Sequence, residues 1–216
     1  MNFSVIRGAD TIWGHTFAIQ LAKQKRHLIL LGKQISVLEA RRDQILEHSE
    51  VQVHCFEADD TDTRSIMAVA EHINTYFEVD MLVNYTETGF DQKLVDYDIF
   101  NLEKKLKTNY ATGTLYTHQL LPNLTLHGQA YILDLWCSET PATAWEQALV
   151  VFNMRFSDYL NSELQDSGVG ISSCTLQKAV DDYGMTLSEA QLSEEAADIV
   201  QRLLYNVSQA CVENEK

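Results

Sequence analysis

Two glycines near the start of the chain, Gly8 and Gly14, could form a phosphate-binding loop. They follow a short apolar segment and precede a helical pattern. Glycines at such a junction let the backbone approach a phosphate group, and the amides and dipole of the following helix favour negative charge there. Because chance matches to half of such a motif are common, the loop indicates a nucleotide only if the rest of the chain supplies a matching fold.

Other groups that could do chemistry are not arranged for it. The seven histidines show no metal-ligand spacing, so we expect no metal site, and His15 and His54 are interpreted as packing or surface residues. The chain has no Gly-x-Ser-x-Gly elbow and no P-loop. The four cysteines are widely spaced in apolar stretches, which is typical of reduced core thiols rather than disulfides.

The composition favours a single cytoplasmic domain over residues 1–216. The apolar content of 45% supports a sizeable core, and two prolines and nine glycines leave no room for a flexible linker. The net charge of -15 repels phosphates, so neither nucleic acid nor an anionic membrane is an expected partner. The first residues turn polar too soon for a signal peptide, and no apolar run approaches the ~20 residues of a membrane span.

Short β-type segments alternate with longer helical patterns. Strands are expected at residues 3–7, 27–31, 51–58, 79–84, 130–135 and 169–174, with a short final strand at 209–213. Helices are expected at residues 11–25, 34–48, 61–76, 97–120, 142–164 and 193–205; the 97–120 segment is one long helix or two broken ones, ended by Pro122. This alternation predicts right-handed crossovers between parallel strands, and so a Rossmann-like, doubly wound α/β sheet in three layers. Ligands bind such sheets at the carboxyl ends of the strands.

Segments at these strand ends resemble motifs of the short-chain dehydrogenase/reductase family. Residues 7–14 are similar to its Thr-Gly-x-x-x-Gly-x-Gly loop, with Ile12 in place of the middle glycine. The segments around Asp59 and Asn84 resemble its Asp-Val-Thr-Asp and Asn-Asn-Ala-Gly motifs, and Asn109 matches its catalytic asparagine. Residues 160–169 and 208–214 resemble a later helix end and the closing strand. The resemblance implies a cofactor site made by Gly8, Ile12, Trp13, Gly14, Lys33, Asp59 and Asn84.

The clearest departure from the family is its proton-transfer pair. Members usually carry Tyr-x-x-x-Lys on one helix, whereas none of the nine tyrosines here is followed by a lysine four residues later. On the resemblance, Glu146 takes the tyrosine position and Val150 the lysine position. The family's serine, at the end of the fifth strand, falls on Asp134 or Leu135, with Ser138 the nearest hydroxyl. If the protein is active, the candidate catalytic residues are Asn109, Ser138 and Glu146.

Cofactor binding is expected to be weak or lost. Ile12 would put methyl groups where phosphate should lie and resists the positive φ that glycine permits, and a misfit of ~2–3 kcal/mol weakens binding roughly 30- to 150-fold. Glu87 and Glu146 would add carboxylates to a site for a polyanion. Lys33 lies where NADP-preferring members have a basic residue, so any dinucleotide bound is expected to be NADP.

The leading hypothesis is a divergent family member that has lost ordinary dehydrogenase activity and acts in binding, sensing or scaffolding. The alternative is an NADP-dependent oxidoreductase with relocated catalytic groups. A third possibility is a non-catalytic partner of an active relative. The resemblance implies a homodimer through the helices at 97–120 and 142–164, with candidate contacts from Ala148, Leu149, Val151, Phe152 and Phe156.

Overall fold

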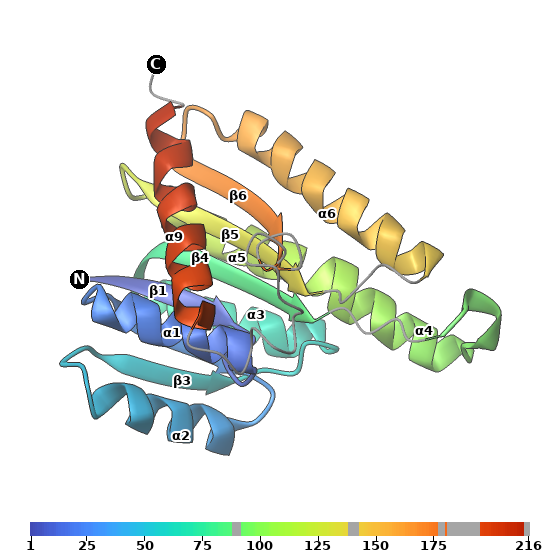
Figure 1. Ribbon diagram of the computed structural model, residues 1–216, viewed down its shortest axis with the longest axis horizontal. Helices are drawn as coiled ribbons and strands as arrows, with labels where there is room; N and C mark the ends of the chain where they lie inside the picture. Colours follow the sequence, from blue (N-terminus) through green and yellow to red (C-terminus); the bar gives the residue numbers. More distant parts are fainter. Residues whose placement is uncertain (88–91, 138–142, 177–179, 181–194, 214–216) are drawn as a thin grey trace.

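The computed structural model describes residues 1–87, 92–137, 143–176, 180 and 195–213 (Figure 1). The described strands form one parallel sheet of six in the order β3-β2-β1-β4-β5-β6. They are β1 (Asn2–Arg7), β2 (His27–Gly32), β3 (Val53–Glu57), β4 (Glu78–Glu87), β5 (Ala130–Cys137) and β6 (Val169–Thr175). The strand order reverses between β1 and β4, as in dinucleotide-binding doubly wound folds. The predicted fold class is therefore confirmed.

Helices cover both faces of the sheet (Figure 1). The described helical elements are α1 (Ile12–Lys23), α2 (Ile35–Leu46), α3 (Thr63–Tyr76), η1 (Leu94–Asp96), α4 (Ile99–Leu106), η2 (Lys107–Ala111), α5 (Thr112–Leu124), α6 (Ala144–Glu163) and α9 (Glu195–Glu213). One apolar cluster joins the sheet to α1, α2 and α9, through residues such as Trp13, Leu38 and Val200. A second joins it to α3, α5 and α6, through residues such as Ile66, Tyr116 and Leu160.

The final strand predicted at residues 209–213 is wrong, because these residues extend the helix α9. A short apolar run does not by itself distinguish a strand from a helix. Here the run continues a helix that already buries Ile199, Val200 and Leu203 at helical spacing. The helix continues to Glu213.

The segment predicted at 97–120 has the first of the two expected forms, because it is helical without a gap from Ile99, although it contains a π-helical turn. It consists of α4, the π-helical turn η2 and α5, which follow one another directly from Ile99 to Leu124. Pro122 does not end α5, which continues to Leu124. A proline this close to the end of a helix removes few hydrogen bonds, and burial of Leu120 and Leu124 holds the last turn against the sheet.

Aspartate side chains cap the starts of α3 and α4. Asp62 caps α3 by accepting a hydrogen bond from the Arg64 amide at 3.0 Å. Asp98 caps α4 by accepting from two amides. Within the described part of the chain, no helix is both long and apolar enough to cross a membrane.

Candidate functional site

The glycine loop after β1 is tightly packed. Gly8 has φ +78°, and a Cβ there would lie 3.0 Å from Tyr85 Cδ1. A Cβ on Gly14 would lie 2.1 Å from the Gly8 carbonyl oxygen. Thr11 closes the turn, because its hydroxyl donates to Gly8 O at 2.7 Å and accepts from the Gly14 amide at 3.0 Å. Both glycines are thus required by geometry, one for its φ and one for helix–strand contact.

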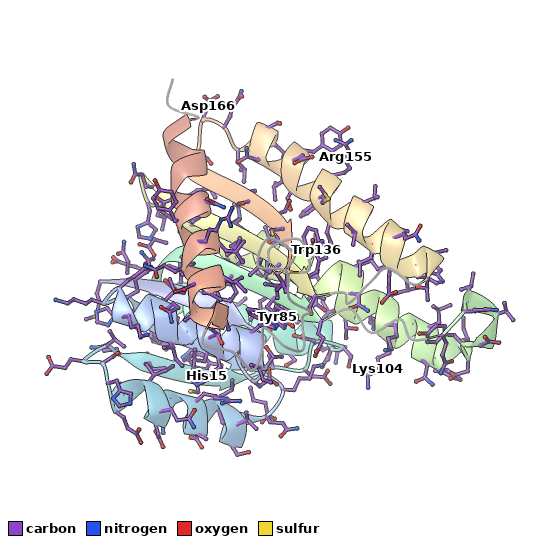
Figure 2. All side chains as sticks on the ribbon, in the orientation of Figure 1. His15, Tyr85, Lys104, Trp136, Arg155 and Asp166 are labelled. Atoms are coloured by element: carbon purple, nitrogen blue, oxygen red, sulfur yellow. The ribbon has the colours of Figure 1, made fainter. Side chains whose placement is uncertain are left out.

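A cavity of about 280 Å³ opens beside this loop at the carboxyl ends of β1, β2 and β4. Figure 2 shows Tyr85, one of its lining residues, among these strand ends, and Lys104 further out on α4. The full lining is Arg7, Gly8, Asp10, Thr11, Gly32, Lys33, Asp60, Tyr85, Thr86, Glu87, Thr108 and Asn109. It therefore includes three residues of the predicted site, Gly8, Lys33 and Asn109.

Ile12 and Trp13 differ in their exposure to solvent. Ile12 is the first residue of α1 and is 44% exposed. Among the described residues the only non-glycine with positive φ is Lys25, so the expected backbone strain at Ile12 is wrong: the position is helical. The indole of Trp13 is fully buried in the core. Neither residue is among those that line the cavity, but the exposed Ile12 side chain lies at the start of α1, next to the glycine loop.

Arg7 is a buried cation on the floor of the cavity. Its Nη1 lies 3.3 Å from Asp60 Oδ2, and its Nη2 donates to Thr86 Oγ1. Its Nε, also buried, has no partner among the described residues. The guanidinium thus connects the ends of β1, β3 and β4.

Asp59, a predicted cofactor residue, holds the backbone of the turn that follows β3. Its Oδ1 accepts hydrogen bonds from the Thr61 amide at 2.8 Å and hydroxyl at 2.7 Å, and these bonds lower the pKa of Asp59. The side chain is exposed, and the neighbouring Asp60 lines the cavity in its place. Asp60 was not predicted from the sequence, because the resemblance to the family motif assigned the cofactor-binding role to Asp59.

Asp10 was also missed, although it follows a strand end. Its Oδ2 accepts a hydrogen bond from the Lys33 amide at 3.0 Å. The cavity is therefore lined by the three carboxylates of Asp10, Asp60 and Glu87, and by the cations Arg7 and Lys33. The expectation of an acidic cleft holds for Glu87 but not for Glu146, which is not among the lining residues.

A smaller cavity of about 20 Å³ lies against the polar ends of β4 and β5. Asn84 donates from Nδ2 to Thr117 Oγ1 and to Asp134 Oδ1, both at 3.0 Å. Ser157 donates to Asp134 Oδ2 at 2.8 Å. Burial raises the pKa of Asp134, although these bonds and the charge of Arg7 act in the opposite direction. Asn84 thus belongs to a buried network and does not line the larger cavity.

Asn109 lies between the two cavities and lines both. It belongs to the π-helical turn η2 and is buried. Its Oδ1 accepts no hydrogen bond from the described residues. The structure therefore leaves this buried amide oxygen without a hydrogen-bond partner among the described residues, and the catalytic assignment of Asn109 stays a prediction.

Glu146 has a structural role at the start of α6. Its Oε2 accepts from the Thr143 amide at 3.3 Å, and its own amide donates to Thr143 Oγ1 at 3.3 Å. This reciprocal pair is a capping box, which ties the carboxylate to the helix end. Val150, four residues on, is half-buried and carries no charge.

The fifth strand ends two residues later than predicted, which affects the position assigned to the family's serine. β5 runs to Cys137, so its end is neither Asp134 nor Leu135. Cys137 is buried. Ser138, the nearest hydroxyl predicted, lies outside the described residues.

Two tyrosines that the sequence did not single out lie at the cavities. Tyr85 lines the larger one and Tyr110 the smaller one, where its hydroxyl donates to the Trp145 carbonyl at 3.3 Å. Burial raises the pKa of both phenols. A lysine that activates a tyrosine would lower its pKa, so neither phenol has the environment of the family's proton donor. No group of three or more His, Cys, Asp or Glu in the described part of the chain is placed to hold a metal ion.

The family follows from the sequence comparison. Residues 2–139, more than half of the chain, match the model of the family described as short chain dehydrogenase. The chain belongs to this family. The uncharacterized oxidoreductase YusZ of Bacillus subtilis (strain 168) is 25% identical over 135 residues, which are 62% of this chain and 48% of that protein. The chain thus spans about half the length of this relative.

Solved structures share the whole fold at low identity. A metagenomic short-chain oxidoreductase in complex with NADP has a TM-score of 0.80 at 17% identity, covering 97% of this chain and 92% of that one. The bulky-bulky ketone specific alcohol dehydrogenase from Comamonas testosteroni has a TM-score of 0.82 at 16% identity, covering 97% and 84%. These likenesses establish the Rossmann arrangement of the chain.

The residues at the loop fit the phosphate-bearing part of a dinucleotide. The close approach of Gly14 to Gly8 leaves the amide end of α1 without side-chain cover from either glycine. The adjoining cavity has both hydrogen-bond acceptors and cations on its walls. The Ile12 side chain, at the same helix end, is the one poor match.

Proposed function

We propose that this protein binds an adenine dinucleotide in the cleft beside the glycine loop and acts as a binding or sensing protein, without the ordinary dehydrogenase chemistry of its family. Family membership and the NADP complex of a structural neighbour support the ligand class. Two features support the loss of ordinary chemistry, the missing Tyr-x-x-x-Lys pair and the capping role of Glu146.

The capping box is the observation that carries this proposal. A general acid must be free to give its proton to the substrate. The Glu146 carboxylate is buried and held by Thr143 at the helix start. At the partner position, Val150 can neither lower the pKa of an acid nor hold a ribose hydroxyl. The helix that carries the chemistry in the family therefore keeps here only its packing role.

The remaining residues support binding. Gly8 and Gly14 would let the backbone approach the phosphates, and the amides at the start of α1 would favour their charge. Asn109 presents an unpaired amide oxygen beside the cleft. A bound nicotinamide would supply hydride-transfer chemistry. Carbonyl reduction would also need a proton donor beside it, and the resemblance provides none.

Isothermal titration with NADH and NADPH tests the binding part of the proposal. We expect saturable but weak binding, because the Ile12 side chain lies at the phosphate end of α1. Ile12→Gly should tighten binding by roughly 30- to 150-fold if the misfit is ~2–3 kcal/mol. Ile35→Gly is a matched control, since Ile35 is likewise the exposed first residue of a helix, but of α2 and not of the helix that follows the glycine loop. Lack of heat with every variant would reject dinucleotide binding.

The second candidate is an NADP-dependent oxidoreductase with relocated groups, drawn from Asn109, Ser138 and Glu146. Family membership and the free Asn109 oxygen favour it. A screen of carbonyl substrates that follows NADPH consumption separates the two functions. We expect no turnover above that of a denatured sample. Turnover that is abolished by Glu146→Gln would establish the oxidoreductase and reject our proposal.

We further propose a homodimer through α4 and α6, with a mixed oligomer with an active relative as the rival assembly. Ile99, Phe100, Val151 and Phe152 are exposed apolar residues on these helices. Leu149 is fully buried within the monomer and is removed from the predicted contact set. Sedimentation equilibrium of Val151→Lys against wild type tests the homodimer, with a monomeric variant as the expected result.

A further inference from the structure

Asp10 brings a carboxylate from the loop after β1 to the end of β2. Its Oδ2 accepts a hydrogen bond from the Lys33 amide at 3.0 Å. A Cβ on Gly32 would lie 2.7 Å from both Cγ and Oδ1 of Asp10, so only glycine permits this approach. The carboxylate therefore has a defined place on the cavity wall, next to Gly32 and Lys33.

This place is where a doubly wound dinucleotide domain distinguishes the two kinds of adenosine ribose. An Asp or Glu about 20 residues after the glycine loop accepts a hydrogen bond from the 2′-hydroxyl of NAD, whereas a basic group accommodates the 2′-phosphate of NADP. Here the end of β2 carries no acid of its own. The acid at the end of β3, Glu57, accepts from the Ile35 amide at 2.9 Å and does not line the cavity. Asp10 supplies the missing carboxylate from a different element.

Charge decides which ribose this wall favours. Oδ1 of Asp10 accepts no hydrogen bond from the described residues, so it can accept one from a 2′-hydroxyl. A phosphate at that point would carry about -1.5 to -2 charge against the carboxylate. Lys33 acts in the opposite direction, but it is exposed and solvent screens its ammonium. Asp60 and Glu87 add further negative charge to the same cavity.

We propose that Asp10 makes this cleft select the unphosphorylated adenosine ribose, and hence NAD over NADP. The inference rests on the proposed function, because it presupposes that the cleft binds a dinucleotide. It reverses the preference that Lys33 alone indicated in the sequence. A carboxylate–phosphate contact in a partly screened cleft corresponds to a preference of about tenfold or more.

The test uses calorimetric binding of ADP-ribose and of its 2′-phosphorylated form, which need no catalysis. Wild type should bind ADP-ribose about tenfold or more tightly. Asp10→Asn keeps an oxygen for the Lys33 amide but removes the charge, so it should bring the two affinities to within about threefold or invert them. Glu57→Gln is the matched control and should keep the wild-type ratio. Lys33→Ala leaves the contact of its backbone amide intact and should widen the ratio, which keeps the test decisive if Asp10→Asn fails to fold.

The outcomes separate this inference from the proposed function. Binding of both ligands with equal or better affinity for the 2′-phosphorylated form would overturn the role of Asp10 and leave dinucleotide binding standing. A preference that survives Asp10→Asn unchanged would do the same. Absence of binding for either ligand, with every variant folded by circular dichroism, would reject both.

Discussion

Arg7 and Asp60 form an ion pair on the floor of the cleft, with 3.3 Å between Nη1 and Oδ2. Their side chains are 4% and 15% exposed, so the pair is largely shielded from water. Thr86 accepts from the same guanidinium. The pair therefore holds the ends of three strands together at the point where the proposed ligand binds.

Removing the cation should destabilise the protein, because Asp60 would remain as an uncompensated buried charge. Arg7→Met is expected to lower the free energy of unfolding by roughly 3 kcal/mol. Arg7→Met combined with Asp60→Asn should recover part of this loss. Urea denaturation measures both, with Arg42→Met as the control, since the pair of Arg42 with Asp43 is at the surface and is worth about 1 kcal/mol or less. An Arg7→Met variant as stable as the control would contradict the assignment.

Gly14 and Gly128 provide a matched pair for the packing of the glycine loop. A Cβ on Gly14 would lie 2.1 Å from Gly8 O, whereas a Cβ on Gly128 meets nothing within 4 Å. Gly14→Ala should therefore cost roughly 3 kcal/mol or more, because β1 and α1 must separate. Gly128→Ala should stay within about 0.5 kcal/mol of wild type. Thermal unfolding of both variants checks this, and similar melting temperatures would show that the loop is not under this constraint.

Most of the fold could be predicted because its signals are local and repeated. Segments that alternate between strand and helix periodicity fix the order of elements and the parallel sheet. The closing segment could not be predicted, since residues 209–213 are apolar enough for either state. The anchoring of α9 by Ile199 and Leu203 decides the outcome, and that contact is tertiary.

The site could be predicted in part, since the predicted residues Gly8, Lys33 and Asn109 line the cavity. Gly8 and Gly14 were found because turn geometry demands glycine. The contact of Asp10 with Lys33 and that of Arg7 with Asp60 were not predicted. Each joins residues that are distant in the sequence. The capping role of Glu146 did have a local signal, a threonine three residues before a glutamate at a helix start, which the family resemblance obscured.

His15 predicts a pH dependence of stability. Burial, with the charge of Arg41, lowers its pKa from 6.5 to about 4, against a smaller opposing effect from Gln44. Between these two pH values the unfolded chain binds a proton that the folded chain does not. The free energy of unfolding should therefore be fully retained above pH 6.5 and fall as the pH drops to about 4, by up to about 3 kcal/mol from this residue.

His15→Gln isolates this contribution from that of the carboxylates. Denaturation curves at several pH values should show a shallower loss for this variant than for wild type over the same range. His48→Gln, at an exposed position, is the control and should retain the wild-type slope. Parallel curves for His15→Gln and wild type would mean that the folded chain accepts the proton on His15 without cost.

Two substitutions of Glu146, to glutamine and to alanine, distinguish a structural role of this residue from a catalytic one. A glutamine can also complete a capping box, so Glu146→Gln should keep the stability of wild type to within about 0.5 kcal/mol. Glu146→Ala cannot reach the Thr143 amide and should lose about 1 kcal/mol. If Glu146 were the proton donor, the two variants would be equally inactive in a carbonyl reduction assay, whatever their stability. Since we place it in the cap, we expect ADP-ribose binding by Glu146→Gln to match wild type, and an affinity loss in that variant would indicate that the carboxylate reaches the ligand.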